Sequence, residues 1–246
     1  MEELQGRRYL VSGASSGIGR AVSRKLLEHG ARVVGLSRRD ASIPVLDELP
    51  DRFAPRFEAV MCDVTEVENL VASISRVLDG GPVLDGAVLC HGYGDFGNLE
   101  EFSNARISQM FCVNLASYGM ICRQLVPFLK ARKSGDIVFV GSESGLRAGK
   151  KGAVYSASKF GLQGLARALR DECAASGVRI SIINPGLVQT AFFDSLDFEP
   201  GEHRDNYLLP EDVAAAVCLA LGLPRGSVID EINLSPQKKV IRNTQK

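Results

Sequence analysis

The sequence predicts an α/β fold, a single doubly wound domain in which helices cover both faces of a mostly parallel seven-stranded sheet. Along the 246 residues, short β-branched apolar runs alternate with longer stretches of helical period, which is the pattern of a parallel sheet with crossover helices. Hydrophobic residues make up 45% of the chain, enough for a full core without disulfides or metal. No linker, internal repeat or low-complexity tract divides the chain, so residues 1–246 are predicted to form one domain.

Seven runs are predicted to be strands because they are short and rich in β-branched and aromatic residues. They are Arg8–Ser12, Arg32–Leu36, Arg56–Cys62, Gly86–Cys90, Asp136–Val140, Arg179–Asn184 and Ser227–Ile232. Helical spacing fills the connections at Gly17–His29, Glu66–Leu78, Asn104–Arg132, Ala153–Ala175 and Pro210–Leu221, with a weaker helix at Ile43–Leu49. Residues that commonly begin or end helices and strands support these boundaries. Gly30 ends the first helix, Gly135 precedes the fifth strand, and Pro210 begins the last helix ahead of two acidic residues.

The longest stretch without clear periodicity is residues 191–209. It contains Phe192, Phe193 and Phe198, which make it more apolar than a solvated loop should be. We therefore expect a mobile lid over a binding site, with an ordinary surface excursion as the alternative.

Charge composition excludes several function classes. Lysine and arginine number 29, as do aspartate and glutamate, so the formal net charge is zero. A neutral chain lacks the basic surface of a nucleic-acid-binding protein or of a polybasic membrane anchor. The N-terminus is polar, and its first apolar run, Tyr9–Val11, is too short for a signal peptide or a membrane span. We expect a soluble, cytoplasmic protein that binds neither nucleic acid nor membrane.

The cysteines predict neither a disulfide framework nor a metal site. They are scattered without a C-x-x-C pair, and only three histidines are present. We expect reduced, core-type residues at Cys62, Cys90, Cys112, Cys122, Cys173 and Cys218.

A glycine-rich turn joins the first strand to the first helix. Small residues there would let the backbone approach a dinucleotide pyrophosphate, and the helix N-terminus offers unpaired N–H donors and the positive end of its dipole. The spacing is G-x-x-x-G-x-G rather than the commoner G-x-G-x-x-G, and a purely structural turn is the alternative. The predicted cofactor contacts in this turn are Gly13, Ser15, Ser16, Gly17, Ile18 and Gly19.

The end of the second strand indicates which dinucleotide binds. No carboxylate stands there to bond a ribose 2′-hydroxyl, and Ser37 and Arg38 take its place. A guanidinium suits a 2′-phosphate, so the sequence favours NADP(H) over NAD(H), although a solvated arginine pair would look the same. Asp63 and Val64, just past the third strand, are placed to meet an adenine edge.

Three polar residues form the candidate catalytic set. Tyr155 and Lys159 are four residues apart at the start of a predicted helix, on one face, where an ammonium would lower the tyrosine pKa from about 10 toward working pH. Ser142 follows the fifth strand and is placed to hydrogen-bond the same substrate oxygen. Taken alone, a Tyr-x-x-x-Lys pair is also compatible with packing and snorkelling.

In their order and spacing, these residues resemble the shorter, non-extended branch of the short-chain dehydrogenase/reductase family. The likeness spans Arg8 to about Ile232 and implies a Rossmann fold with an Asn-Ser-Tyr-Lys tetrad. The matching positions are Gly13, Gly17, Gly19, Asp63, Asn114, Ser142, Tyr155, Lys159, Pro185, Gly186 and Thr190.

The resemblance also implies roles. Hydride would move between nicotinamide and a carbonyl carbon while Tyr155 acts as acid in reduction or base in oxidation. Lys159 would also hold the nicotinamide ribose, Asn114 would bind Lys159 through a water, and Thr190 would bond the carboxamide. The remaining implied cofactor contacts are Asp63, Val64, Cys90, His91, Gly92, Tyr155, Pro185, Gly186 and Val188.

One turn departs from the family pattern. Where the family shows Asn-Asn-Ala-Gly after the fourth strand, this chain has Leu89-Cys90-His91-Gly92, which keeps only the final glycine. We expect cofactor binding through the backbone to survive. His91 is interpreted as a structural hydrogen-bonding residue rather than a catalytic one, and Cys90 as a core residue rather than a nucleophile.

The sequence thus predicts an NADP(H)-dependent oxidoreductase acting on a ketone, an aldehyde or a secondary alcohol, similar to the branch that takes small hydroxy acids and carbonyls. A 3-oxoacyl thioester reductase is the next choice, and a non-catalytic NADP(H)-binding sensor or scaffold is the alternative from another class. The basic stretch Arg147–Lys151 borders the predicted cleft and would suit an anionic substrate, or would simply be solvated. The resemblance implies a homodimer or homotetramer built on the helices near Asn104–Arg132 and Ala153–Ala175.

Overall fold

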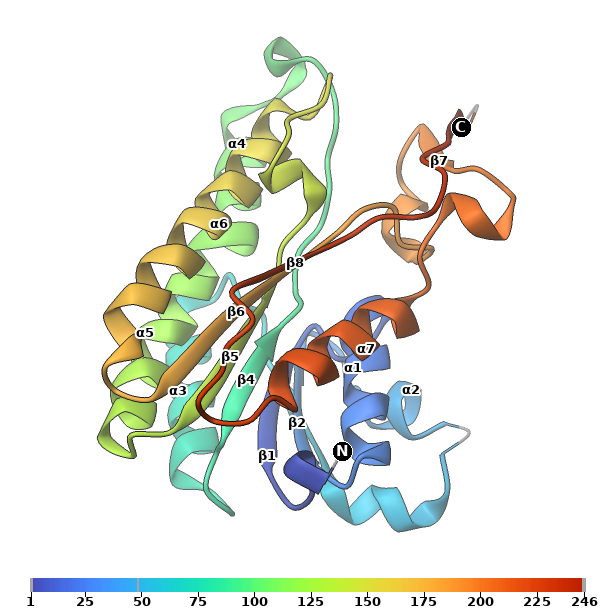
Figure 1. Cartoon of the computed structure of the whole chain (residues 1–246). Coiled ribbons are helices and arrows are strands. Elements are labelled where there is room, and N and C mark those ends of the chain that lie inside the picture. Colours follow the sequence, from blue (N-terminus) through green and yellow to red (C-terminus); the bar gives the residue numbers. More distant parts are fainter. Residues whose placement is uncertain (1, 48, 245–246) are drawn as a thin grey trace.

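In the computed structural model, a parallel sheet of seven strands forms the centre of the molecule (Figure 1). Residues 2–47 and 49–244 are described. The strand order is β3-β2-β1-β4-β5-β6-β8, and every neighbouring pair in the sheet is parallel. The strands are β1 (Arg8–Ser12), β2 (Arg32–Ser37), β3 (Phe57–Met61), β4 (Gly86–Leu89), β5 (Gly135–Val140), β6 (Val178–Pro185) and β8 (Glu231–Leu234).

Helices cover both faces of this sheet. One face carries α1 (Gly17–Glu28), α2 (Ser42–Leu46) and α7 (Pro210–Leu221), and the other carries α3 (Val67–Asp79), α4 (Asn104–Phe111), α5 (Ser117–Ala131) and α6 (Ala153–Ala174) (Figure 1). Two buried apolar clusters fill the two layers between sheet and helices, because the strands are apolar on both faces. The predicted doubly wound α/β fold with seven parallel strands is confirmed.

Two of the predicted elements differ in the structure. The last strand of the sheet begins at Glu231 rather than Ser227, because Arg179 draws the preceding segment into a loop. Its guanidinium donates to the carbonyls of Leu223 at 2.8 Å and Ser227 at 3.1 Å, so these groups are not free for a sheet ladder. The weaker predicted helix over residues 43–49 is only the short α2, and residue 48 lies outside the described residues.

The helix predicted over Asn104–Arg132 is interrupted at its middle. Between α4 and α5 lies a π-helical turn, Cys112–Ala116, and such turns widen a helix locally and are frequent at functional sites. Its central residue, Asn114, is fully buried beside the end of the sheet. Helical period in a sequence does not distinguish this widened turn from a regular one, since the apolar face continues through it.

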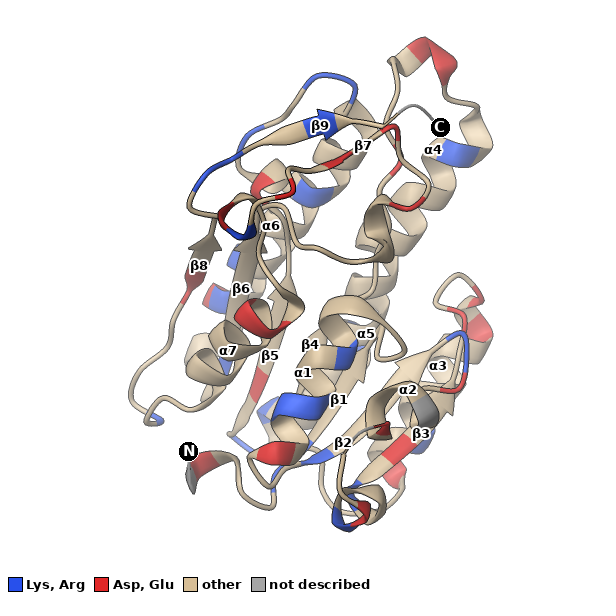
Figure 2. Ribbon diagram, turned by 90° about the vertical axis from the view of Figure 1, so that its right-hand side faces the viewer, with Lys and Arg blue, Asp and Glu red and all other residues tan. Residues whose placement is uncertain are grey.

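A small two-stranded sheet was not predicted. Strand β7 (Phe198–Pro200) pairs antiparallel with β9 (Ile241–Asn243) near the C-terminus of the chain, with Phe198 opposite Asn243 and Pro200 opposite Ile241. Acidic residues mark β7 and the turn beyond it, and a basic residue marks β9 (Figure 2). The arginine on β9, Arg242, forms ion pairs with Glu199 and Glu202. Residues 191–209, predicted as a lid, therefore include a strand joined to the C-terminal segment.

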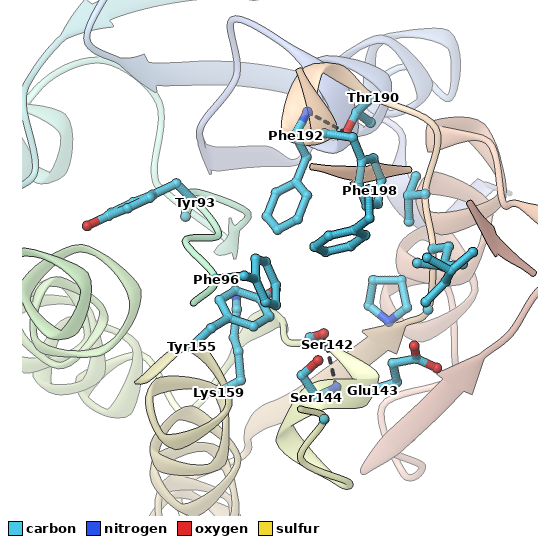
Figure 3. A pocket seen from close by; sticks show the side chains of 18 of the residues that line it. Tyr93, Phe96, Ser142, Glu143, Ser144, Tyr155, Lys159, Thr190, Phe192 and Phe198 are labelled. Carbon is cyan, nitrogen blue, oxygen red and sulfur yellow. Dashed lines mark hydrogen bonds between the residues drawn. The ribbon is translucent and has the colours of Figure 1, made fainter. Parts of the chain in front are cut away.

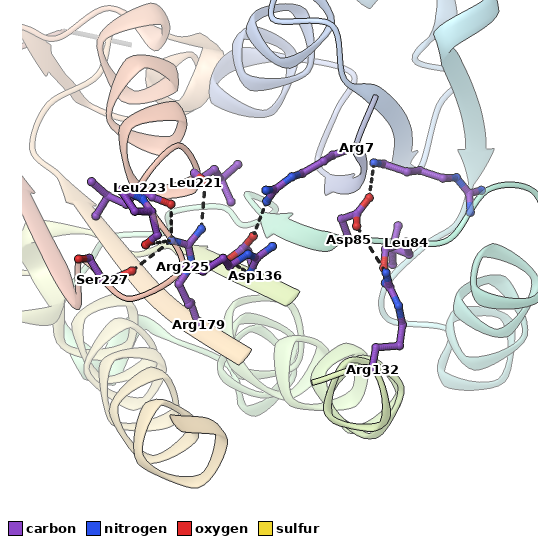
Figure 4. A network of polar contacts seen from close by, with 12 residues as sticks. Arg7, Leu84, Asp85, Arg132, Asp136, Arg179, Leu221, Leu223, Arg225 and Ser227 are labelled. Carbon is purple, nitrogen blue, oxygen red and sulfur yellow. Dashed lines mark hydrogen bonds and ion pairs between the residues drawn. The ribbon is translucent and has the colours of Figure 1, made fainter. Parts of the chain in front are cut away.

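A buried charge cluster holds the sheet at the ends of the strands opposite to the glycine turn (Figure 4). Asp136 on β5 lies 2.6 Å from Arg179 Nε, 3.4 Å from Arg225 and 3.7 Å from Arg7. Asp136 and Arg179 are both buried. Because an isolated buried carboxylate is costly, the surrounding arginines are what make this position tolerable. The cluster therefore stabilises the fold, and the pocket lies at the opposite ends of the strands.

Candidate active site

The main pocket opens at the carboxyl ends of the strands, where the chain changes direction between β1 and β4. Open α/β sheets bind ligands at such a switch point. The cavity holds about 430 Å³ and is lined by the turns after β1, β4, β5 and β6 and by residues from the β7–β9 region (Figure 3).

The glycine turn after β1 has the geometry that a phosphate group needs. Gly13 and Gly17 have φ angles of 72° and 50°, which favour glycine. A Cβ on Gly19 would lie 2.2 Å from the carbonyl oxygen of Gly13, so only glycine fits there. At the start of α1, Ser16 makes no side-chain capping bond in the part of the chain that the structure describes, so the first N–H groups can face an anion.

Across the groove, Thr190 lies against this turn. Its Cγ2 would be 3.3 Å from a Cβ on Gly17, and its hydroxyl accepts a hydrogen bond from Phe192 N at 3.2 Å. Ile18 also lines the pocket, and so do Pro185, Gly186 and Val188 from the segment after β6. Ile18, and Gly17 through its closeness to Thr190, therefore lie at one groove with that segment.

The end of β2 carries a positive charge whose field reaches the turn after β3. Ser37 is buried and donates its hydroxyl hydrogen to the carbonyl of Arg39, while Arg38 is exposed. Asp63 accepts hydrogen bonds from the amide and hydroxyl of Thr65 at 2.9 and 2.7 Å, and these bonds, with help from the charge of Arg38, lower the pKa of Asp63. One carboxylate oxygen of Asp63 is thus used to shape the turn before α3, and Val64 packs against the core.

The unusual turn after β4 is built around His91. Its Nδ1 lies 2.6 Å from the hydroxyl oxygen of Ser12, and its Nε2 lies 2.8 Å from that of Ser117. Its ring stacks on the ring of Tyr118, with 4.1 Å between the two centroids. Burial lowers the pKa of His91 to about 3, so the ring is neutral. Both ring nitrogens are thus occupied by hydroxyl groups of the protein, as a structural role of His91 requires.

Cys90, in the same turn, is no nucleophile in this environment. Burial raises the pKa of its thiol to about 12, so it is protonated. All six cysteines are free; four of them are buried, and Cys90 and Cys112 are partly exposed.

The four predicted tetrad residues converge on one end of the pocket. Tyr155 and Lys159 lie on the first turns of α6, Ser142 follows β5, and Asn114 projects from the π turn. Tyr155 and Lys159 are 6% and 5% exposed and line the pocket together with Ser142. Lys159 Nζ is 5.9 Å from the centroid of the Tyr155 ring (Figure 3).

Asn114 connects the β4 turn to α6. Its Oδ1 accepts from Tyr93 N at 3.1 Å, and its Nδ2 donates to Tyr93 O at 2.9 Å and to Ser158 Oγ at 3.2 Å. A Cβ on Gly92 would lie 3.1 Å from Asn114 Oδ1 and 3.6 Å from Lys159 Nζ. Asn114 and Lys159 therefore flank the same small space beside Gly92.

The expected lowering of the Tyr155 pKa by Lys159 is wrong in direction. Burial raises the pKa of Tyr155 to about 12, and the hydrogen bond with Ser142 offsets this only in part. Burial also lowers the pKa of Lys159 to about 8. The four-residue spacing does place both groups on one helix face, but burial is the largest cause of both pKa shifts because both groups lie away from water.

Aromatic residues surround Tyr155: Phe192 and Phe198 come from the segment predicted as a lid, whereas Phe96 was not predicted to belong to the site. Phe96 follows β4, and its ring centroid lies 5.1 Å from that of Tyr155 and 5.0 Å from that of Phe198. The ring centroid of Phe192 lies 6.0 Å from that of Tyr155. Gly94 makes room for these rings, since a Cβ there would come within 2.3 Å of Phe192. No short-range pattern in the sequence joins Phe96 to residues a hundred positions later, so only the folded chain reveals this wall.

Within residues 2–47 and 49–244, no cluster of three or more histidine, cysteine or acidic side chains could hold a metal ion. No helix among them is both long and apolar enough to cross a membrane.

A doubly wound sheet with a glycine-rich groove after β1 is typical of proteins that bind a nicotinamide dinucleotide. Comparison with protein families specifies the class: the model described as short chain dehydrogenase matches residues 7–200, and the chain belongs to this family.

The chain is similar to relatives along nearly its whole length. Dehydrogenase/reductase SDR family member 11 of Mus musculus is 31% identical over 258 residues, covering 98% of this chain and 98% of that protein. An alcohol dehydrogenase from the archaeon Thermococcus sibiricus, solved with 5-hydroxy-NADP, superposes with a TM-score of 0.84 at 26% identity, over 96% of this chain and 99% of that one. A metagenomic short-chain oxidoreductase solved with NADP gives a TM-score of 0.79 at 30% identity, over 96% and 100% of the two chains.

Proposed function

We propose that the protein is an NADP(H)-dependent oxidoreductase that interconverts a ketone or aldehyde and its alcohol, with Tyr155 as the acid or base. The observation that carries this proposal is the convergence of Tyr155, Ser142 and Lys159 on one end of a pocket that continues into the glycine groove. A nicotinamide dinucleotide bound in that groove supplies or accepts a hydride.

Within the pocket, each residue has a separate task. Ser142 donates a hydrogen bond to the substrate oxygen and keeps it oriented. Tyr155, with a pKa of about 12, is protonated at physiological pH and so is ready to give its proton to that oxygen in the reductive direction. Lys159, positively charged below its pKa of about 8, stabilises the phenolate that remains.

Asn114 completes the set as a positioning residue. Through Tyr93 and Ser158 it ties the turn after β4 to α6, and it flanks the space beside Gly92 together with Lys159. A water in that space would link Lys159 to Asn114 and carry a proton toward solvent.

Arg38 supports a preference for NADP(H). It is exposed at the end of β2, where a guanidinium can form a charge-assisted contact with a 2′-phosphate, and no carboxylate follows β2 at that position. Two similar solved structures, the archaeal alcohol dehydrogenase and the metagenomic oxidoreductase, hold NADP-type ligands.

An acidic substrate is a second candidate, favoured by the pocket rim. Arg147, Lys150 and Lys151 are exposed and line the pocket, so they would attract a carboxylate or the phosphates of an acyl thioester. Replacing Lys150 and Lys151 with Gln should then raise KM for a 3-oxoacyl thioester and weaken its salt dependence. An unchanged KM would remove this candidate.

The first experiment measures NADPH oxidation against ketones, aldehydes, quinones and 3-oxoacyl thioesters, with NADH in parallel. Turnover with NADPH well above that with NADH is the expected result. Tight NADPH binding without turnover of any carbonyl would instead favour the sensor or scaffold. A cytoplasmic location and a homodimer or homotetramer remain predictions, and light scattering over a concentration series tests the oligomer.

A further inference from the structure

The C-terminal segment of the chain forms part of the pocket wall. Strand β9 pairs with β7, and the side chains of Lys239, Ile241 and Asn243 line the pocket. These positions are two residues apart, as expected where one face of an extended segment is directed to one side.

The alternate positions fix the segment in place from its other face. Lys238 forms an ion pair with Asp205 at 2.7 Å, and its backbone N–H donates to the carbonyl of the same residue at 2.8 Å. Gly201 N donates to the carbonyl of Val240 at 3.0 Å. The contacts of Lys238 and of the Val240 backbone thus hold the segment in place, while Lys239, Ile241 and Asn243 line the pocket.

Ile241 presents apolar surface to the pocket. Its side chain is 51% exposed, so a ligand in the pocket can cover it and remove apolar surface from water. Phe198 lies on the paired strand, and its ring contacts Phe96, which in turn contacts Tyr155. An apolar wall of aromatic rings therefore runs from Tyr155 to β7, the strand that pairs with β9 and whose Pro200 lies opposite Ile241.

An ion pair joins this wall to the catalytic turn. Glu143 directly follows Ser142, and its Oε1 lies 2.6 Å from Lys239 Nζ. A Cβ on Gly186 would lie 3.2 Å from both Glu143 Oε2 and Pro236 Cδ, so the C-terminal segment also packs closely against the turn after β6. Lys239 neutralises a carboxylate whose field raises the pKa of Tyr155, and it sets the position of β9 relative to Ser142.

We propose that β9 determines the substrate range of this site. Ile241 selects carbonyl compounds whose apolar or aromatic group is long enough to extend from Tyr155 along Phe96 and Phe198 to β9. The pair of Glu143 and Lys239 is the positioning element that holds the wall. The inference rests on the proposed carbonyl chemistry and names its substrate class.

The test compares variants at neighbouring positions on opposite faces of one segment. Ile241→Ala removes the pocket-facing group and Val240→Ala is its matched control, while Lys239→Gln and Lys238→Gln form the second pair. The probes are 2-butanone, acetophenone and 4-phenyl-2-butanone with NADPH. Ile241→Ala should lower the kcat/KM ratio of 4-phenyl-2-butanone to 2-butanone about fivefold, because the long substrate loses apolar contact and the short one does not reach β9. Val240→Ala should leave the ratio within about twofold of its original value.

Lys239→Gln should lower the same ratio and also lower kcat for all three ketones, since it leaves the Glu143 carboxylate unpaired near Tyr155, where its field opposes the phenolate that forms. Adding Glu143→Gln should restore kcat, whereas a merely structural role of Lys239 would predict a lower melting temperature and no recovery of kcat in the double variant. Lys238→Gln should leave kcat unchanged, because Lys238 pairs with Asp205 rather than with Glu143. Equal ratios for Ile241→Ala and Val240→Ala would overturn the proposal.

Binding separates this inference from the proposed function. If the protein reduces none of the three ketones with either cofactor, the carbonyl chemistry fails, and isothermal titration with 4-phenyl-2-butanone then tests the wall directly. About fivefold weaker binding to Ile241→Ala than to Val240→Ala would support the wall. Equal affinities, or no binding to the unmodified protein, would overturn it.

Discussion

Lys159 Nζ lies 5.9 Å from the centroid of the Tyr155 ring, and burial acts on the two groups in opposite directions. It raises the pKa of the phenol to about 12 and lowers that of the ammonium to about 8. Both shifts favour the neutral form of each group, because a charge away from water is costly. The pocket thus holds a protonated phenol beside a lysine that gains or loses its charge near physiological pH.

Loss of the phenol hydroxyl should abolish turnover. Tyr155→Phe removes the proton donor while the ring keeps its contacts with Phe96 and Phe192, so kcat for carbonyl reduction should fall by roughly 10³-fold, within the usual contribution of a general acid. The melting temperature and the affinity for NADPH should stay close to those of the unmodified protein. Tyr207→Phe, a tyrosine outside the pocket lining, is the control and should keep full activity. Full activity of Tyr155→Phe on a good substrate would refute the mechanism.

The rate of reduction should depend on pH through Lys159. As pH rises through about 8, Lys159 loses the charge that stabilises the developing phenolate, while Tyr155 stays protonated until about pH 12. kcat/KM for carbonyl reduction should therefore be highest below pH 8 and decline above it, as measured between pH 6 and 10. Lys159→Arg keeps the charge and should remove the decline from this range. A profile of the unmodified protein that is flat from pH 7 to 10 would contradict the assignment.

Arg38 should discriminate between the two cofactors. Arg38→Gln removes a charge-assisted contact to the 2′-phosphate, and KM for NADPH should rise roughly tenfold to a hundredfold while KM for NADH changes little. Arg39→Gln is a matched control, because Arg39 is also exposed and only its backbone carbonyl contacts Ser37. Steady-state kinetics with both cofactors at two salt concentrations give the comparison. Equal effects of the two substitutions would overturn the assignment of the 2′-phosphate contact to Arg38.

Local patterns in the sequence predicted the sheet and one end of the site well. The glycine turn has the positive φ angles that its sequence indicates, and the four-residue spacing of Tyr155 and Lys159 does place both on one helix face. Such features follow from the period of a helix or from the steric demands of a single residue, so they are present in a short window of sequence.

Features that depend on distant parts of the chain were not predicted. The pKa of Tyr155 is decided by burial, to which Phe96 and Phe192 contribute from other segments. The pairing of β7 with β9 joins two strands only three residues long, each too short to show a clear alternation. Neither strand identifies its partner, because the register depends on packing against the pocket and on ion pairs formed after folding.

The last prediction concerns the buried charge cluster of Figure 4, opposite the pocket. Asp136→Asn keeps the shape of the side chain but leaves the buried Arg179 without its carboxylate partner at 2.6 Å. The free energy of unfolding should fall by roughly 3 kcal/mol, because breaking a buried pair leaves an uncompensated charge. Asp230→Asn is the matched control: it breaks a pair with Arg170 at 2.7 Å, but the Asp230 side chain is 69% exposed, so the loss should stay within about 1 kcal/mol. Urea unfolding of both variants measures the difference. Equal losses would mean that the arginines around Asp136 find other partners, and that the cluster does not hold the base of the sheet.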